Sequence, residues 1–206
     1  MSLLEQFMKE DSNDHTKQGS DAWHEWRSKH IGASEIPAIM GTCDFKGIYQ
    51  LWLEKTGQVE KFKGNWATRR GHEYEPIARE EYSKVTGYKV EDKVLEYEAW
   101  PVLSASLDGF VVESSTVVEI KTPSKAKHQL ALSGTIPDTY KDQIQAQLLV
   151  AGVSRADYVS YAPGEPDSTR VAIVKVEADP ERQAAILERA KFFWQCVETN
   201  TPPVGS

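Results

Sequence analysis

The sequence predicts an α/β fold in which a central mixed β-sheet is flanked by α-helices on both faces. Helical and strand patterns follow one another along the 206 residues in the order α-α-β-β-β-α-β-β-α. The strand segments alternate apolar with polar side chains, whereas the helical segments place apolar residues three and four positions apart. No internal repeat or low-complexity tract is present. We therefore expect one domain over residues 1–206, with a mobile N-terminal segment (1–20) and a polar tail (199–206).

Composition limits the class of protein. The net charge of −7 counts against a protein that coats nucleic acid with a basic face, but nucleic acid stays open as a substrate because metal-binding carboxylates are themselves acidic. The two cysteines, Cys43 and Cys196, form no C-x-x-C pair, which indicates a reduced, cytoplasmic setting without zinc or an iron–sulfur cluster. The sequence has no membrane-length apolar run and no signal-peptide pattern, so we expect no contact with a membrane.

Ser34 and Arg27 form a candidate anion site in the N-terminal part of the chain. Ser34 precedes a short apolar run over residues 36–40 and is predicted to cap that helix. A helix N-terminus with a hydroxyl and free N–H groups can hold a phosphate, and Arg27 could add a bidentate contact. The alternative is an ordinary cap beside a surface arginine, and the local sequence alone favours this alternative.

Two longer helices are predicted next. One covers residues 48–56, and another covers residues 66–86, where Pro76 should either kink the helix or start a new one. Glu75 shares a helix face with Gly71 and could reach a metal ion held by the sheet. A row of glutamates on a helix is usually a solvated face, so Glu75 alone is weak evidence for a site.

The remaining elements complete the sheet and its cover. The predicted strands cover residues 88–97, 102–106, 117–121, 157–163 and 170–177. The predicted helices cover residues 138–153 and 181–198. Asp179-Pro180 should cap the last helix, because proline is favoured at the first helical position. Gln143 and Gln147 lie beside the apolar stripe of their helix, where glutamines are usually boundary residues.

The central stretch of the chain, residues 104–121, carries the strongest chemical signal. Side chains alternate between the two faces of a strand, so Glu119 and Lys121 share one face. Asp108-Gly109 is predicted to turn the chain at the mouth of a hairpin, which would place Asp108 beside Glu119. Two carboxylates and a lysine at one point make a site for a hard divalent cation and a nucleophilic water.

Six short motifs agree in order with a known family. They are D-A-W-H-x-x-R (21–27), I-G-A-S-E (31–35), G-x-x-Y-E (71–75), S-x-D-G (106–109), E-I-K (119–121) and Y-x-x-Q-x-Q (140–145). Together they resemble the YqaJ-type viral recombinases, the alkaline exonuclease group to which lambda exonuclease belongs. One motif of common residues is weak evidence, but several motifs in a consistent order are specific. The resemblance implies the PD-(D/E)XK nuclease fold.

The resemblance implies roles at a reaction centre. The implied metal ligands are Asp108, Glu119, Glu75 and the main-chain carbonyl of Ile120. The implied cofactor is Mg²⁺, as two ions, for which Mn²⁺ would substitute. Lys121 would either deprotonate the attacking water or only hold it, and Gln143 would support the site beside the scissile phosphate. The residues implied to hold the 5′-phosphate of a DNA end are Arg27, Ser34 and Ser106, with Lys127 or Lys125 as a further contact.

The implied activity is Mg²⁺-dependent 5′→3′ exonuclease digestion of double-stranded DNA. It would release 5′-mononucleotides from the 5′-phosphorylated strand and leave 3′ single strands for recombination by strand annealing. The implied partners are DNA ends, a single-strand annealing protein and further copies of the chain in a homotrimeric ring. We expect the protein to act in the cytoplasm of a bacterial host, encoded by a phage or prophage.

Two other classes of function stay open. The chain could be an endonuclease or junction resolvase of the same fold, or a non-catalytic DNA-binding module. The presence of all three of Asp108, Glu119 and Lys121 favours an enzyme, because a catalytically inactive protein of the same fold would not need these residues. An iron–sulfur nuclease is disfavoured, since two cysteines cannot supply four ligands.

Overall fold

The structure is a computed structural model that describes residues 21–60 and 66–203. The predicted mobile segment over residues 1–20 and the end of the predicted tail lie outside the described residues. In chain order the elements are α2 (Asp21–Ser28), β1 (Ile31–Gly32), the 3-10 turn η2 (Ala33–Glu35), α3 (Ile36–Met40), α4 (Ile48–Lys55), α5 (Trp66–Thr86), β2 (Glu91–Glu96), β3 (Leu103–Val111), β4 (Thr116–Lys121), α6 (Lys125–Leu132), α7 (Asp138–Ala151), β5 (Arg155–Tyr161), α8 (Asp167–Arg170), β6 (Val171–Glu177) and α9 (Pro180–Glu198). None of these helices combines the length and the apolar character that a membrane span requires.

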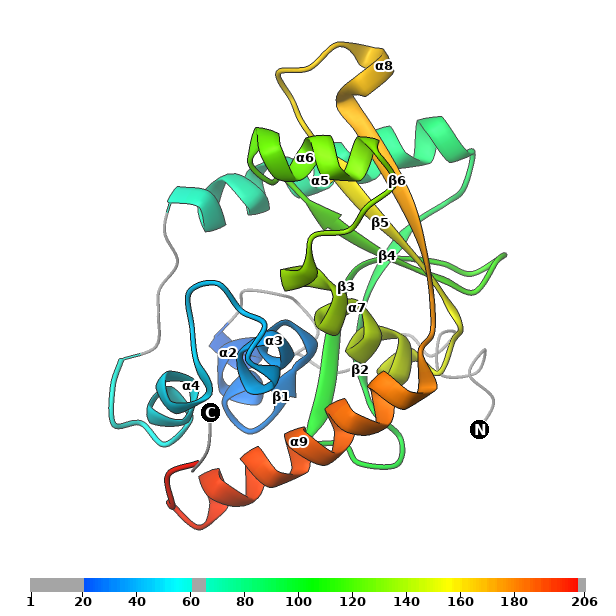
Figure 1. Cartoon of the computed structure of the whole chain (residues 1–206). Coiled ribbons are helices and arrows are strands. Elements are labelled where there is room, and N and C mark those ends of the chain that lie inside the picture. Colours follow the sequence, from blue (N-terminus) through cyan, green and yellow to red (C-terminus); the bar gives the residue numbers. More distant parts are fainter. Residues whose placement is uncertain (1–20, 61–65, 204–206) are drawn as a thin grey trace.

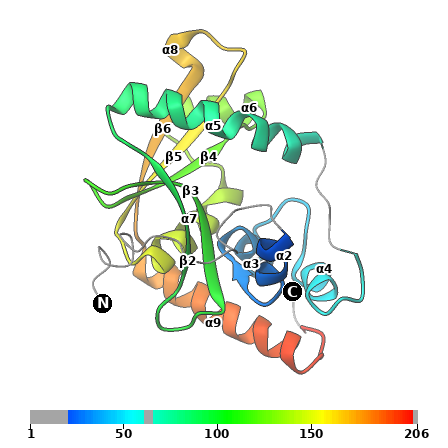
Figure 2. The same cartoon turned by 180° about the vertical axis from the view of Figure 1, so that it is seen from behind.

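Six strands form one mixed sheet in the order β1-β3-β4-β5-β6, with β2 paired to β3 outside this path. β3 runs antiparallel to β2 and β4 and parallel to β1, whereas β5 runs parallel to β4 and antiparallel to β6. Helices cover both faces: α7 lies in front of the sheet in Figure 1, and α5 lies in front of it in Figure 2, which is seen from behind. The predicted α/β fold with a central mixed sheet is therefore confirmed.

β1 and β4 pair with the same edge of β3 and leave a break between them. Ser104 pairs with both β1 and β2, and Phe110 pairs with both β2 and β4, so β2 takes one edge of β3 while β1 and β4 share the other. On the shared edge the β1 ladder ends at Ser104 and the β4 ladder begins at Gly109. Residues 105–108 of β3 thus have no strand partner on that edge, and we call this stretch the edge break.

Two apolar clusters hold the sheet between its helices. On one face Val117 of β4 belongs to the cluster that contains Ile144 of α7. On the other face Val118 of β4 belongs to the cluster that contains Tyr82 of α5. Burial of each such side chain contributes about 1.5–3 kcal/mol to folding. Successive residues of β4 therefore alternate between the two faces, as the sequence predicts, and Glu119 lies on the face that α7 covers.

Asp108 and Gly109 form a β-bulge inside β3, so the predicted turn at these residues is wrong. Between two successive pairs of the β2–β3 ladder, β3 carries one residue more than β2. The chain turns later, at residues 112–115. Glycine is required at position 109, because a Cβ atom there would lie 2.3 Å from Cγ1 of Val90. The bulge changes the direction of β3 at Asp108, where the ladder with β4 ends.

Pro76 lies inside α5, which continues to Thr86. Of the two predicted alternatives, a new helix that starts at Pro76 is therefore excluded. Proline in a helix interior removes a main-chain hydrogen bond and costs about 3 kcal/mol. The packing of the fully buried Ala78 and Tyr82 against the sheet offsets this cost.

On the face of the sheet that α7 covers, the buried carboxylate of Asp142 joins α7 to α9, whose first turn is capped by Asp179. The side chain of Asp179 accepts a hydrogen bond from the main-chain N of Arg182 at 2.9 Å, which confirms the predicted cap of α9. The Arg182 guanidinium forms a bidentate ion pair with Asp142 of α7, at 2.6 and 2.8 Å. Asp142 also accepts a hydrogen bond of 2.7 Å from the hydroxyl of Thr42, so it links α7, α9 and the segment that follows α3.

We expect Asp142→Asn to lower the free energy of unfolding by about 2 kcal/mol, because hydrogen bonds to a buried charged group contribute about 1.5–3 kcal/mol. Urea unfolding followed by circular dichroism measures this difference. The matched control is Asp138→Asn on the same helix, whose exposed ion pair with Lys141 should be worth less than about 1 kcal/mol. Equal unfolding midpoints for the two variants would contradict this role of Asp142.

Candidate active site

Glu119 is a carboxylate with no exposed surface, held on the α7 face of β4. Its two oxygens accept hydrogen bonds from the side-chain amides of Gln143 at 2.6 Å and Gln147 at 2.5 Å. These glutamines are four residues apart on α7 and therefore lie on one face of the helix. The ammonium of Lys121, on the same face of β4, forms an ion pair with Glu119. A buried charge needs such partners, because leaving it unpaired would cost several kcal/mol.

Asp108 faces β4 where the ladder between the two strands ends. Its Oδ2 atom accepts a hydrogen bond of 2.8 Å from the main-chain N–H of Ile120. The carboxylate thus accepts a hydrogen bond from an N–H group that would otherwise pair with the main chain of β3 in the β3–β4 ladder. In a strand the N–H and C=O of one residue point to the same side, so the carbonyl of Ile120 also faces Asp108.

Arg79 connects Glu75 of α5 to the bulge. Its guanidinium forms an ion pair of 2.8 Å with Glu75 and donates a hydrogen bond of 2.7 Å to the main-chain oxygen of Asp108. A weaker ion pair of 3.6 Å reaches Asp92 on the neighbouring strand. Arg79 was not predicted as a site residue, although a glutamate and an arginine four residues apart on a helix are a recognisable pair.

The three acids of the site repel one another. Burial raises the pKa of Asp108, and the neighbouring Glu119 raises it further, so the pKa lies well above the ordinary value of the group. Burial also raises the pKa of Glu75, although Arg79 opposes this effect. Burial alone would lower the pKa of Lys121, but Glu119 and Asp108 raise it above its ordinary value. The ammonium form of Lys121 is therefore the stable one between these carboxylates.

The oxygen atoms at the edge break suit a hard divalent cation. In the described part of the chain, no group of three or more His, Cys, Asp and Glu side chains is arranged to hold a metal ion by itself. The oxygens that do face one another belong to Asp108, Glu119 and the main chain of Ile120. Mg²⁺ usually binds through one or two carboxylates and keeps several waters, so this smaller set fits Mg²⁺.

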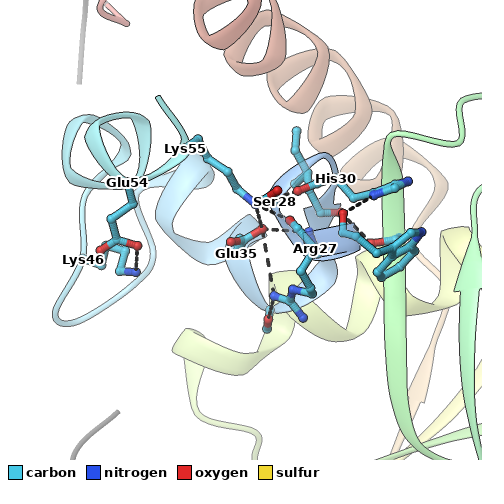
Figure 3. A network of polar contacts seen from close by, with 12 residues as sticks. Arg27, Ser28, His30, Glu35, Lys46, Glu54 and Lys55 are labelled. Atoms are coloured by element: carbon cyan, nitrogen blue, oxygen red, sulfur yellow. Dashed lines mark hydrogen bonds and ion pairs between the residues drawn. The ribbon is translucent and has the colours of Figure 1, made fainter. Parts of the chain in front are cut away.

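Arg27 and Ser34 come together at the other end of the edge break. The Arg27 guanidinium donates a hydrogen bond of 2.9 Å to the Ser34 hydroxyl, and β1 between them pairs with the start of β3. The predicted cap is wrong by one residue: Ser34 lies in η2, and Glu35 is the N-cap of α3. The extra turn before α3 leaves the Ser34 hydroxyl facing Arg27. Figure 3 shows Arg27 beside the ion pair that the half-buried Glu35 forms with the buried side chain of Lys55.

The other predicted phosphate contacts lie in different places. Ser106 belongs to the edge break itself. Lys127 forms an ion pair of 2.9 Å with Asp44, and its ammonium lies 5.3 Å from the ring centroid of Tyr140. The Lys121 ammonium lies 5.6 Å from the same ring, so Lys127 belongs to the Glu119 end of the site.

Lys125 lies elsewhere and is strongly exposed. It lies 3.8 Å from Glu165 and lines a separate cavity of about 230 Å³ together with Arg70. The structure therefore places Lys127, rather than Lys125, beside the ring of Tyr140 near which Lys121 also lies.

Gln147 and Tyr140 were not predicted as site residues. Gln147 is fully buried against Glu119, and Tyr140 lies beside the ammonium groups of two lysines. The signal for Gln147 was its spacing of four residues from Gln143, but nothing local distinguishes such a pair from boundary residues. In the sequence Tyr140 stood out only as part of the Y-x-x-Q-x-Q motif, without a role of its own.

The sheet, its helices and the paired Asp and Glu-x-Lys define the PD-(D/E)XK nuclease fold. Residues 22–154 match the YqaJ-like viral recombinase domain, and the chain belongs to this family. It is 29% identical over 178 residues to the uncharacterized protein YqaJ of Bacillus subtilis (strain 168), a match that covers 84% of this chain and 55% of YqaJ. The chain thus spans about half the length of that relative.

Solved structures of exonucleases share the fold. The alkaline exonuclease LHK-Exo of Laribacter hongkongensis superposes with a TM-score of 0.78 at 26% identity, over 88% of this chain and 94% of LHK-Exo. Its complex with dAMP gives a TM-score of 0.76 at 25% identity, with the same coverage of both chains. A phage-related exonuclease of Haemophilus somnus 129PT gives a TM-score of 0.66 at 16% identity, over 84% of this chain and 96% of the other.

We expect Asp108→Asn to stabilise the protein in the presence of a chelator, by about 1–2 kcal/mol at pH 8. Asparagine keeps an acceptor for the N–H of Ile120 but carries no charge, so it avoids the cost of burial and the repulsion from Glu119 that together raise the pKa of Asp108. Because that pKa is raised on folding, wild-type stability should fall as the pH rises above about 3.8 through the folded-state pKa.

Urea unfolding in EDTA over pH 5–8 tests this expectation for Asp108. The gain from Asp108→Asn should shrink toward acid pH, where the wild-type carboxyl takes up a proton. A variant less stable than wild type at pH 8 would show that the acids do not repel one another in the folded protein.

Proposed function

We propose that this chain is a Mg²⁺-dependent exonuclease that digests the 5′-ended strand of duplex DNA. The observation that carries the proposal is the arrangement along the edge break: Asp108, Glu119 and Lys121 lie at one end, and Arg27 with Ser34 lies at the other. Family membership and the likeness to LHK-Exo, a protein described as an alkaline exonuclease, support the same activity. It would release 5′-mononucleotides and leave a 3′ single strand.

The carboxylates supply the metal site in this proposal. Asp108, Glu119 and the Ile120 carbonyl would hold Mg²⁺, and Glu75 would join them through water or by releasing Arg79. When bound, Mg²⁺ supplies a water of lowered pKa and neutralises charge on the reacting phosphate. Gln143 and Gln147 fix both oxygens of Glu119, so the carboxylate keeps one orientation.

Lys121 would orient the attacking water. In the metal-free protein its ion pair with Glu119 and its raised pKa favour the ammonium form, which donates hydrogen bonds to a water or to a phosphate oxygen. This favours the positioning role over the role of general base. Arg27 and Ser34 would hold the 5′-terminal phosphate, since a guanidinium fork and a hydroxyl match its oxygens.

We expect linear duplex DNA to lose its 5′ label first in a time course with Mg²⁺, and to stay intact in EDTA. Lys121→Ala should lower the rate by about 10²-fold or more, because a positioned proton donor or acceptor contributes that much. Lys141→Ala on the exposed face of α7 is the matched control and should retain activity. Digestion that persists in EDTA, or in the Lys121→Ala variant, would overturn the proposal.

The same assay separates the proposed exonuclease from an endonuclease. Covalently closed circular duplex has no end, so it should survive incubation with the wild-type protein and Mg²⁺. Nicking of the circle would favour an endonuclease or junction resolvase of the same fold. Earlier loss of the 3′ label would overturn the proposed polarity alone.

We expect Arg27→Ala and Gly32→Ala to lower the preference for 5′-phosphorylated over 5′-hydroxyl ends by about 10–100-fold, the worth of a charged hydrogen bond. A Cβ atom at Gly32 would lie 2.5 Å from Nη2 of Arg27, so the guanidinium must leave its place. Gly32 has an extended backbone that alanine also adopts, so the fold should survive.

The measurement for Arg27 and Gly32 is the ratio of kcat/KM values for the two ends. The control is Gly47→Ala, where the backbone is also extended and an added Cβ atom would have no neighbour within 4 Å. An unchanged ratio in Arg27→Ala would remove the phosphate role of Arg27. The homotrimeric ring, the annealing partner and the cytoplasmic setting stay predictions.

A further inference from the structure

Lys55 places a charged ammonium inside the protein, next to the proposed phosphate site. Its side chain is only 2% exposed and forms an ion pair of 2.9 Å with Glu35. The same ammonium donates hydrogen bonds to the main-chain oxygens of Arg27 at 3.1 Å and His30 at 2.6 Å. The Arg27 carbonyl lies in the last turn of α2, and His30 follows the helix just before β1. Figure 3 shows Lys55 reaching from α4 to this end of α2.

Glu35 connects Lys55 to the next segment of the chain. One of its carboxylate oxygens accepts a hydrogen bond of 2.8 Å from the main-chain N–H of Gly32 and lies 4.0 Å from Nη2 of Arg27. Burial alone would raise the pKa of Glu35, but Lys55 and Arg27 lower it below its ordinary value. The carboxylate is therefore ionised at neutral pH, and it links Lys55 to the main chain of β1 at Gly32.

Stability alone does not explain this arrangement. A buried ion pair loses much of its attraction to the cost of removing both charges from water, and apolar residues of similar volume often serve as well. An ion pair adds a defined geometry, because the charged groups of Lys55 and Glu35 form hydrogen bonds with particular main-chain groups. Those groups carry Arg27 and Ser34, whose side chains meet at 2.9 Å.

The position of the Arg27 guanidinium tolerates little displacement. It lies against Gly32 so closely that a Cβ atom there would come within 3.0 Å of three of its atoms. Gly32 is also the residue whose N–H group Glu35 accepts. A shift of this main chain would therefore move the surface on which the guanidinium rests.

We propose that Lys55 and Glu35 are positioning residues, which hold the Arg27 guanidinium in the geometry that selects a 5′-phosphorylated DNA end. The proposal rests on the proposed function, because it assigns the preference for that end to Arg27. Lys55 and Glu35 do not contact the phosphate in this proposal. They act on Arg27 through the main chain that carries it.

The test compares kcat and KM for linear duplexes with a 5′-phosphate or a 5′-hydroxyl. We expect Lys55→Met to lower the preference for the phosphorylated end about tenfold, mainly by raising KM for that end. If Lys55→Met does not give a cooperative melt, the pair Lys55→Met with Glu35→Gln replaces it, because that variant leaves no unpaired buried charge. The 5′-hydroxyl substrate reports any general loss of activity, which a merely structural role would produce equally at both ends.

The matched control breaks another ion pair of the same helix. Lys46 pairs with the buried Glu54 at 2.6 Å, and Figure 3 shows this pair on the side of α4 away from Arg27. Lys46→Met should leave the preference unchanged even if it lowers the melting temperature. A comparable loss of preference in Lys46→Met would show that weakening α4 in any way is sufficient, and would overturn the proposal.

Combination with Arg27→Ala separates the possible outcomes. Residues that act only through Arg27 add nothing once it is gone, so the double variant with Lys55→Met should keep the preference of Arg27→Ala. A further loss in the double variant, or a wild-type preference in folded Lys55→Met, would overturn the positioning role while Arg27 keeps its own. If Arg27→Ala itself keeps the wild-type preference, the proposed phosphate site fails and this inference fails with it.

Discussion

The burial of the Glu119 carboxylate is the constraint on which the rest of the site depends. An ionised group without exposed surface must be matched by donors, and here Gln143, Gln147 and Lys121 supply them. The two glutamines can do so only if α7 lies on this face of the sheet in one register. The Asp142 ion pair then holds α7 against α9, so the layer that stabilises the sheet also orients the chemistry.

The interruption of β3 converts a stable sheet into a site. A regular ladder would use the N–H of Ile120 to continue the pairing of β4 with β3. The bulge at Asp108 ends that pairing, so a side-chain carboxylate accepts this N–H instead. β1 resumes the same edge only at Ser104. Main-chain groups of β3 in the intervening stretch therefore have no strand partner on this edge, while both of its ends are anchored in the sheet.

The α/β architecture and the proximity of Asp108 to Glu119 could be predicted from the sequence. The signals were the alternation of apolar and polar residues in the strands and the order of the short motifs, and both can be read directly along the chain. The sequence placed Asp108 on a turn, because Asp-Gly is usually found in turns. In the structure the glycine lies inside a strand, where the side chain of Val90 leaves no space for a Cβ atom at position 109. β1 has only two residues and shows no alternation. Arg79 and Lys55 act through contacts between distant segments, which no local pattern encodes.

The charges at the two ends of the edge break are of opposite sign, and this supports one orientation of the substrate. At the β1 end, the cations Arg27 and Lys55 share the carboxylate of Glu35. At the β4 end, three carboxylates outnumber Lys121 and Arg79, and burial with mutual repulsion keeps the pKa of Asp108 high. A terminal phosphate carries more charge than an internal phosphodiester, so it gains most at the cationic end. In the proposed function, the internal phosphodiester would then lie at the acidic end, where divalent cations would be needed before any polyanion could approach.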